Sequence, residues 1–498
     1  MGEPCIIALD EGTTGTRALL MDKAGRVVKQ AYRRLRVYYP RSGWVEQDPE
    51  EIWESTRAVL SEMIQEATAR SWDVVGMGIS NQRETAVLWD SQTGKPLHPA
   101  VVWQCRRTED MCRELAAQGV EELVIAKTGL PIDPYFSATK MAWMLSRIDN
   151  ADRLISQGRI RLGTIDTWLV WKLTAGSTFV SDVSNASRTQ LLDINTLSWS
   201  EELAEIFKVP LECLPIVVPS GGQVGVTTGV EGVRDGIPIL AIMGDSQAAL
   251  YGETAFSSGD TKVTYGTGSS VLVNTGEQSV TPSHGLAATV GWQLNGRTTY
   301  ALEGIIHATG AGIEWLYQGL SLIADPADTE AMAESVPDTG GVYFVPAFTG
   351  LGTPWWNTRA RGLIVGITRG TKREHIVRAA LDAIAYQVKD VYDIIEKVIP
   401  LKDGSVFCGG GASRNRYLMQ LQADLLQRPI LTTSNPEASG RGVATMAGLV
   451  AGIWEQSDLV HFHEEIVDEK FLPQKDPAAV AALMERWHEA VKRSLDWA

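Results

Sequence analysis

The chain of 498 residues contains no run of basic residues, and its 45 Lys and Arg against 60 Asp and Glu give a formal net charge of −15. Binding a row of nucleic-acid phosphates requires clustered positive charge, so we expect no nucleic-acid partner. No apolar stretch approaches the roughly 18 residues that cross a membrane. An acid, Glu3, stands where a signal peptide would carry a basic segment. The sequence therefore predicts a cytoplasmic protein with no membrane span.

Cysteine and proline are also scarce. The five cysteines form no Cys-x-x-Cys pair, which argues against a disulfide framework and against a cysteine zinc site. The 21 prolines are too few for a disordered or linker-rich chain. Two nucleotide-binding motifs are missing, the Gly-x4-Gly-Lys-Ser/Thr loop and a complete Gly-x-Gly-x-x-Gly. Any phosphate site must therefore be built from other turns.

The same strand-and-turn pattern occurs twice in the chain. Strand-like residues 5–10 and 17–22 flank a glycine turn, and a helix follows that begins at Asp48-Pro49. The pattern restarts at residues 262–265, returns at 270–274 and continues into a hairpin with an Asn295-Gly296 turn. We therefore expect two related α/β domains, residues 1–253 and 254–498.

Three polar turns that contain glycine lie at strand ends. They are Gly12–Arg17, Tyr265–Ser270 and Gly409–Gly411, the last between a predicted strand at 405–408 and a helix at 413–426. Small residues, free backbone N–H groups and hydroxyls suit a polyphosphate with magnesium. Any one of these turns is more simply interpreted as a tight hairpin. Together, in two similar halves, they indicate a nucleotide bound in a cleft between domains.

Longer stretches give a specific resemblance. The first turn resembles the phosphate-1 motif of the actin, Hsp70 and sugar-kinase superfamily, and the chain is similar to the FGGY carbohydrate kinases, most closely to their glycerol kinase branch. The matching stretches are residues 80–85 (SNQRET), 101–107 (VVWQCRR), 128–130, 133–137, 163–168, 185–188, 265–268, 345–352 and 362–382. The resemblance runs from residue 6 to about 450, and the last 45 or so residues are uninformative.

The resemblance implies two actin-like (ribonuclease H-like) ATPase domains, each with a mixed five-stranded sheet, around an active-site cleft. The first would hold the polyol pocket, the first phosphate turn and a catalytic Asp, and the second would hold the second phosphate turn and the adenosine site. The implied reaction is ATP-dependent, Mg²⁺-assisted phosphorylation of glycerol to sn-glycerol 3-phosphate. Two alternatives are a kinase of a longer polyol or ketose, and an ATP-driven conformational protein like actin or Hsp70.

Asp245 is the candidate general base. It follows the apolar run 237–243 and precedes a helix-like run, so its carboxylate is expected at a strand end, where α/β folds place ligands. An Asp that only caps the helix is the alternative from sequence alone. The resemblance favours the base, and it implies that Asp10 holds magnesium directly or through water.

Four residues are implied to bind the polyol. Arg83 and Glu84, at the start of a predicted strand at 84–89, would hydrogen-bond its hydroxyls, although an adjacent cation and acid can also be an idle surface pair. Trp103 would contact the C–H side and Tyr135 a hydroxyl. In a chain with 16 tryptophans, both aromatics could instead be core residues.

Nucleotide contacts are implied on both sides of the cleft. The first turn would place Thr13, Thr14, Gly15 and Arg17 on the phosphates. The second domain would add Thr267 and Gly310 near the β- and γ-phosphates and Gly411 and Asn415 at the adenosine, with Glu314 as a further nucleotide-binding residue. The alternative interpretation of these residues is that they are only turn and cap residues.

Several residues depart from the family pattern. Ser246 stands in place of Gln and Ser270 in place of Phe, and both changes shrink a side chain at the polyol. Glu11 and Glu314 replace Gln, and Gly409 replaces Asp. Neither the sugar-bisphosphate loop, expected near 232–236, nor a phosphorylatable histidine is present, so we expect neither regulation. The partners are a small-molecule polyol and ATP, with a homodimer or homotetramer as the expected assembly.

Overall fold

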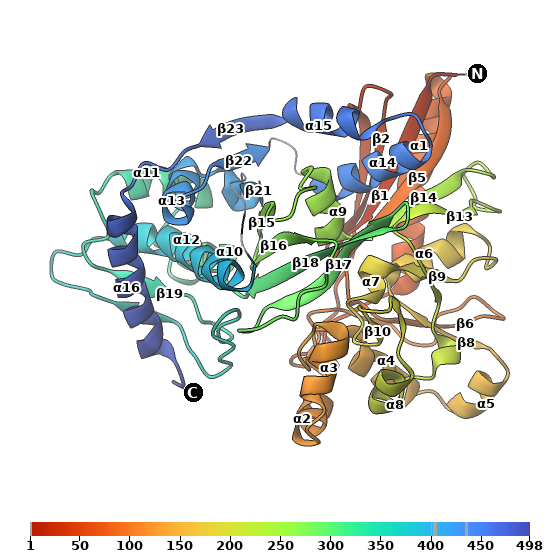
Figure 1. Ribbon diagram of the computed structural model, residues 1–498, viewed down its shortest axis with the longest axis horizontal. Coiled ribbons are helices and arrows are strands. Elements are labelled where there is room, and N and C mark those ends of the chain that lie inside the picture. The colour runs from red at the N-terminus through yellow and green to blue at the C-terminus, as the bar shows by residue number, and fades with distance from the viewer. Residues whose placement is uncertain (1, 400, 402–405, 434–436) are drawn as a thin grey trace.

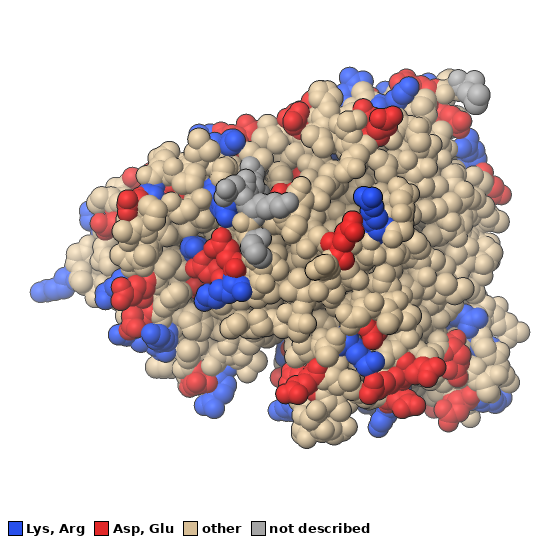
Figure 2. Space-filling model, in the orientation of Figure 1, with Lys and Arg blue, Asp and Glu red and all other residues tan. Residues whose placement is uncertain are grey.

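Two twisted sheets, one from each half of the chain, form the framework of the protein (Figure 1). The computed structural model describes residues 2–399, 401, 406–433 and 437–498. Within these residues, no helix combines the length and the apolar character needed to span a bilayer. On the face drawn in Figure 2, basic and acidic side chains are interspersed.

The first sheet begins with the predicted meander. Strands β1, β2 and β3 are successive antiparallel neighbours, and β1, β5 and β14 run parallel, so their carboxyl ends share one edge. The strand order is β13 (Gly221–Val226), β14 (Pro238–Gly244), β5 (Asp73–Asn81), β1 (Pro4–Glu11), β2 (Gly15–Met21) and β3 (Val27–Arg34). Helix α1 (Pro49–Ala69) begins as predicted, because Asp48 caps it by accepting from the Glu50 N–H.

The second sheet repeats this plan at larger size. Its order is β17 (Ala287–Leu294), β18 (Arg297–Ile306), β16 (Ser269–Gly276), β15 (Thr261–Tyr265), β21 (Val406–Gly410), β22 (Ile430–Thr433) and β23 (Val467–Phe471). The predicted hairpin turn is confirmed, with φ of 52° at Asn295 and 76° at Gly296. Of the strand predicted at 405–408, Ser405 lies outside the described residues.

The prediction of five strands in each sheet is wrong, because the sheets contain six and seven strands among the described residues. The additional strands β13, β17 and β23 each pair antiparallel with one neighbour at a sheet edge. An antiparallel strand can join an edge through a short return of the chain, without a crossover helix. Short runs such as residues 221–226 therefore extend a sheet without a strong local signal in the sequence.

Two helices join the halves. Helix α9 (Asp245–Gly252) packs against α14 (Ala438–Val450), and α14, although it comes from the second half, covers β1, β5 and β14 of the first sheet (Figure 1). A Cβ on Gly442 would lie 1.8 Å from the Ala248 carbonyl oxygen, so the approach of the two helices requires glycine there. One hydrophobic cluster combines Ile6 of the first sheet with Leu272 of the second and Val443 of α14.

The C-terminal residues, on which the sequence was silent, complete the second half. Helix α16 (Pro477–Ser494) buries Trp487 against Tyr386 of α12 (Arg373–Val398). Asp390 of α12 accepts hydrogen bonds from Trp487 Nε1 at 2.7 Å and His488 Nε2 at 2.6 Å. The last strand and helix are therefore structural parts of the second half.

Candidate active site

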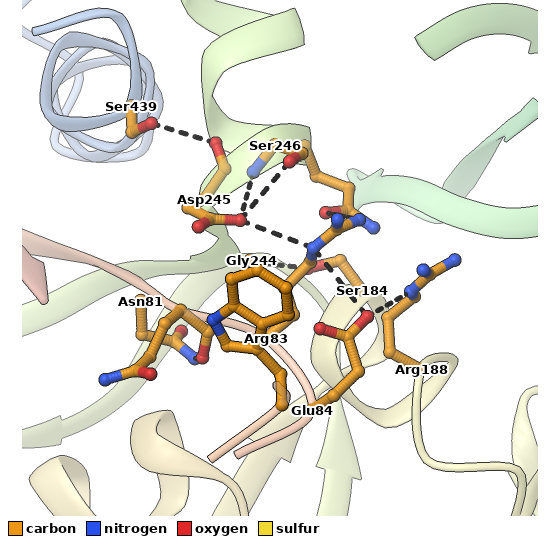
Figure 3. A network of polar contacts seen from close by, with 12 residues as sticks. Asn81, Arg83, Glu84, Ser184, Arg188, Gly244, Asp245, Ser246 and Ser439 are labelled. Carbon is orange, nitrogen blue, oxygen red and sulfur yellow. Dashed lines mark hydrogen bonds and ion pairs between the residues drawn. The ribbon is translucent and has the colours of Figure 1, made fainter. Parts of the chain in front are cut away.

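Asp245 lies where a buried parallel strand ends and a helix begins. The carboxyl side of β14 leads directly into α9, and the Asp245 side chain is 39% exposed. Its Oδ1 accepts from the Ser246 N–H at 2.6 Å and lies 3.3 Å from the Ser246 hydroxyl (Figure 3). Ser439 of α14 donates to the Asp245 carbonyl at 3.0 Å. Gly244, not Asp245, occupies the N-cap position, and the Asp245 carboxylate lies in the first turn of α9.

Arg83 is buried beside Asp245, so the alternative of an idle surface pair is wrong. Its Nε lies 3.3 Å from Asp245 Oδ1, and its outer nitrogens contact Glu303 at 2.8 and 3.3 Å and Gln247 at 3.3 Å. Burial opposes the charge, but the carboxylates of Glu303 and Glu84 raise the pKa of Arg83 well above its usual value. A permanent cation therefore faces the candidate base.

Glu84 has a strained backbone. It lies in a turn before β6 (Val87–Asp90), which begins three residues later than the predicted strand. The Thr85 N–H donates to the Arg83 carbonyl at 2.8 Å, which makes a γ-turn with Glu84 at φ 61°. Ser137 donates to the Glu84 carbonyl at 3.1 Å, and Arg188 Nε donates to its Oε1 at 2.6 Å. Strain of this kind concentrates at functional sites.

The two aromatic candidates lie in contact. The ring centroids of Trp103 and Tyr135 are 5.5 Å apart, and both residues are partly buried and pack against hydrophobic clusters of the core. Trp103 Nε1 donates to Thr13 Oγ1 at 2.9 Å, which connects the aromatic pair to the first glycine turn. Lys140 donates to the carbonyls of Pro134 and Tyr135 and so holds the Tyr135 backbone. Burial, with the Glu84 charge, raises the pKa of the Tyr135 phenol, which therefore stays protonated.

Asp10 lies at the end of β1 and is paired in register with Ser80 of the parallel strand β5. Burial raises the pKa of Asp10 to about 7, opposed by a Ser80 hydrogen bond and assisted by the charges of Asp245 and Glu437. A divalent cation would offset this crowding of carboxylates, and Mg²⁺ prefers one or two carboxylates plus waters. The described residues hold no group of three or more His, Cys, Asp or Glu arranged for a metal.

The first glycine turn is held by its surroundings. Gly12 donates to the Gly15 carbonyl at 3.0 Å, and the Tyr32 hydroxyl donates to the Thr14 carbonyl at 3.0 Å. The Arg17 side chain reaches across to α14, where it forms an ion pair with Glu437. Arg17 therefore ties the first phosphate turn to a helix from the second half of the chain.

The replacement of Gln by Glu11 has a physical explanation. The side chain is buried at the end of β1 and accepts from the Thr16 hydroxyl. Burial raises the pKa of Glu11 well above its usual value, more than its hydrogen bond with Thr16 lowers it. Burial therefore favours the protonated form of Glu11, whose shape is close to that of a glutamine side chain.

A cavity of about 1050 Å³ in the second half gathers five of the predicted nucleotide residues, Thr267, Gly310, Glu314, Gly411 and Asn415. Trp315, Phe348 and Leu381 give it apolar walls, a combination typical of small-molecule sites. A Cβ on Gly310 would lie 2.5 Å from the Gly266 carbonyl oxygen, so glycine is required there. This volume is sufficient for a nucleoside.

The predicted nucleotide residues of the first glycine turn lie outside this cavity, and Asn415 has a second, structural contact. Thr13, Thr14, Gly15 and Arg17 are not among the residues that line this cavity. Asn415 lines it, but its Oδ1 caps α13 (Arg416–Leu426) by accepting from the Leu418 N–H at 2.9 Å. The predicted helix at 413–426 therefore begins at Arg416, after a short 3₁₀ turn at Gly411–Arg414.

The two serines lie near the polyol candidates. Ser246 is next to Asp245, whereas Ser270 is placed by sheet register: across β16 and β18 it pairs with Ile305, and Leu272 pairs with Glu303. Residues opposite each other, and those two positions further along, point to the same face of a sheet. Ser270 therefore lies on the face that presents Glu303 to Arg83.

Three residues of this site were missed from sequence, Arg188, Glu303 and Gln247. Glu303 stands alone in the apolar segment Ala301–Ile306, and a charge in a buried strand needs a partner. That isolation was the available signal. Arg188 was part of a matching stretch but had no role assigned to it.

Comparison with known proteins agrees with this geometry. Residues 5–252 match the FGGY family of carbohydrate kinases, N-terminal domain, and residues 261–451 match its C-terminal domain. The chain belongs to the FGGY family of carbohydrate kinases.

Individual relatives are similar over their whole length. The chain is 46% identical to glycerol kinase 2 of Thermotoga maritima, over 99% of each chain. It is 46% identical to the glycerol kinase of Carboxydothermus hydrogenoformans, over 100% of this chain and 99% of the relative. The crystal structure of Plasmodium falciparum glycerol kinase with ADP superposes with a TM-score of 0.94 at 34% identity, covering 99% of this chain and 98% of that one. The two-domain FGGY kinase fold predicted from sequence is confirmed.

Proposed function

We propose that the protein transfers the γ-phosphate of ATP to glycerol and forms sn-glycerol 3-phosphate and ADP. The observation that carries the proposal is the contact of the half-exposed Asp245 with the buried Arg83–Glu84 pair, beside the Trp103–Tyr135 aromatic pair. The full-length similarity to glycerol kinases supports the same acceptor.

In the reaction, a primary hydroxyl oxygen of glycerol forms a bond to the γ-phosphorus. The bond from that phosphorus to the bridging oxygen of ADP breaks, and the hydroxyl proton passes to the Asp245 carboxylate. Arg83 and Glu84 orient the hydroxyls, the Trp103 indole covers the C–H side, and the Tyr135 phenol binds a hydroxyl. Alignment of the hydroxyl with the phosphate is the main contribution of these residues.

The nucleotide spans both halves in this proposal. The cavity lies in the second half, within residues 254–498. It would bind the adenosine at Gly411 and Asn415, beside Glu314. The phosphate end would lie at Thr267 and Gly310. The first half, residues 1–253, brings Thr13, Thr14, Gly15 and Arg17 to the phosphates. Asp10 would hold Mg²⁺, whose chemistry is to neutralise charge on the phosphate oxygens.

A longer polyol or a ketose is the second candidate acceptor. The observation in its favour is that Ser246 adjoins Asp245 and that Ser270 lies on the same face of the second sheet as Glu303, so small polar side chains stand at both positions.

The test is to identify the product by ³¹P NMR after incubation of the protein with ATP, MgCl₂ and glycerol. The expected result is a glycerol 3-phosphate signal equal to the ADP formed, and no ADP when glycerol is omitted. Equal formation of ADP and inorganic phosphate, with or without glycerol, would instead identify an ATPase of the actin or Hsp70 type and contradict the proposal.

A further inference from the structure

Four buried charges link the two halves of the chain at the polyol site, and Figure 3 shows three of them, Arg83, Glu84 and Arg188. Arg83 and Glu84 follow β5, Arg188 follows α7 (Val183–Ala186), and Glu303 comes from β18 of the second sheet. Their side chains are 5%, 1%, 0% and 0% exposed, respectively. Two cations and two anions therefore balance one another out of contact with water.

Glu303 bridges the two arginines. Its Oε1 lies 2.8 Å from Arg83 Nη2, and its Oε2 lies 2.7 Å from Arg188 Nη2. Burial alone would raise the pKa of Glu303, but Arg188 and Arg83 together lower it to about 2. Glu303 is therefore an anion throughout the physiological range.

Such a cluster is costly as a means of stability alone. Each buried ion loses several kcal/mol of hydration, and well-packed apolar side chains of similar volume often serve as well or better. A cluster retained next to the polyol residues therefore points to a role in arranging them.

The contacts within the cluster determine which atoms of Arg83 and Glu84 remain available to interact with Asp245 and with the hydroxyls of the polyol. Glu303 and Gln247 take both outer nitrogens of Arg83, so its Nε is left to face Asp245. Arg188 donates to Oε1 of Glu84, and no described residue donates to its Oε2. One carboxylate oxygen of Glu84 is thus fixed by Arg188 while the other can accept from a hydroxyl.

We propose that Arg188 and Glu303 are positioning residues for the polyol, and that Glu303 makes the assembly of the polyol site depend on contact between the halves. Arg188 holds the strained Glu84 turn through its carboxylate, and Glu303 holds Arg188 and Arg83 in place from the second sheet. The inference rests on the proposed phosphorylation of a polyol. It assigns to the second half a share in acceptor binding in addition to its nucleotide cavity.

The test is Glu303→Gln, which preserves the shape and removes the charge. We expect the KM for glycerol to rise at least tenfold while the KM for ATP stays within twofold, because Glu303 is not among the residues that line the nucleotide cavity. Arg188→Gln should show the same split. In the double variant, the rise in the KM for glycerol should be no larger than in the worse single variant, because both residues act through one network.

The matched control is Asp90→Asn. Asp90 forms an ion pair with Arg159 at the end of β6, with no contact to the four-charge cluster, so both KM values should stay within twofold of the parent. Glu303→Asp retains the charge and shortens the side chain by one methylene, so it should give a smaller rise in the KM for glycerol. It also provides the measurement if Glu303→Gln does not fold.

The inference is overturned if Glu303→Gln, or Glu303→Asp in its place, leaves the KM for glycerol within twofold. It is equally overturned if the KM values for glycerol and ATP rise together, as general loosening of the fold would produce. These outcomes are distinct from failure of the proposed function, which would appear as absence of glycerol phosphorylation by the parent protein itself.

Discussion

Replacing Asp245 with Asn tests the assignment of the base. Asn retains an oxygen that can accept from the Ser246 N–H, and the Ser439 contact is to the backbone, so the local structure should persist. Arg83 loses one anionic neighbour 3.3 Å away, but Glu303 and Glu84 still surround it. The main loss is the proton acceptor, which typically contributes about 10²- to 10⁴-fold to turnover. This range corresponds to about 2.7–5.5 kcal/mol of transition-state stabilisation.

The assay couples ADP formation to a spectrophotometric readout at saturating glycerol and ATP, and the dissociation constant of ATP is measured by calorimetry. We expect kcat to fall 10²- to 10⁴-fold with the ATP dissociation constant within twofold of the parent. Asp90→Asn, which also neutralises a paired carboxylate, should leave both values unchanged. Turnover of Asp245→Asn within tenfold of the parent would refute the assignment of Asp245 as base.

Three further predictions follow from the same site. Without nucleotide or metal, Asp10→Asn should raise the free energy of unfolding at pH 8 but have little effect below pH 4. The reason is that the pKa of Asp10 is about 7 in the folded protein and 3.8 in the unfolded chain, so the parent protein loses stability as the pH rises between these values. The loss is up to about 4 kcal/mol. Denaturant melts at both pH values check this, and an equal effect at both would contradict it. Ser246→Gln with Ser270→Phe should lower the KM for glycerol and reduce activity on longer polyols, as a panel of acceptors would show; no change in either property would exclude a role for these serines. ATP and glycerol together should reduce the radius of gyration in small-angle scattering, because the phosphate turns lie in both halves, and identical radii with and without both ligands would contradict closure.

Local elements were predictable where the sequence itself encodes their geometry. The Asn295-Gly296 turn fixes a hairpin through its positive φ values, and Asp48-Pro49 marks the start of α1. The edge strands β13 and β23 were not predicted, because no local pattern marks the strands with which they pair, whereas β17 is the first strand of the predicted hairpin. For the same reason, nothing local indicated that α14 would cover the first sheet.

In the candidate site, too, features that depend on local sequence were predictable and features that depend on long-range contacts were not. Asp245 could be located because a strand end followed by a helix can be recognised in the sequence. The burial of Arg83 and Glu84 could not be predicted, because it depends on partner residues that the sequence does not place beside them. Arg188 and Glu303 were missed because their roles depend on ion pairs with residues that are distant in the sequence and adjacent only in the folded protein. The roles of all the site residues, the domain boundary at 253/254, the cytoplasmic location and the homodimer or homotetramer stay predictions.

The measurement that tests the central claim most directly is the rate of ADP formation, with saturating ATP and Mg²⁺, across a series of acceptors. The series comprises no acceptor, glycerol, erythritol, xylitol and a five-carbon ketose. The account predicts the highest kcat/KM with glycerol and negligible ADP without an acceptor. A higher kcat/KM with a longer polyol or the ketose, or an undiminished rate without acceptor, would contradict it.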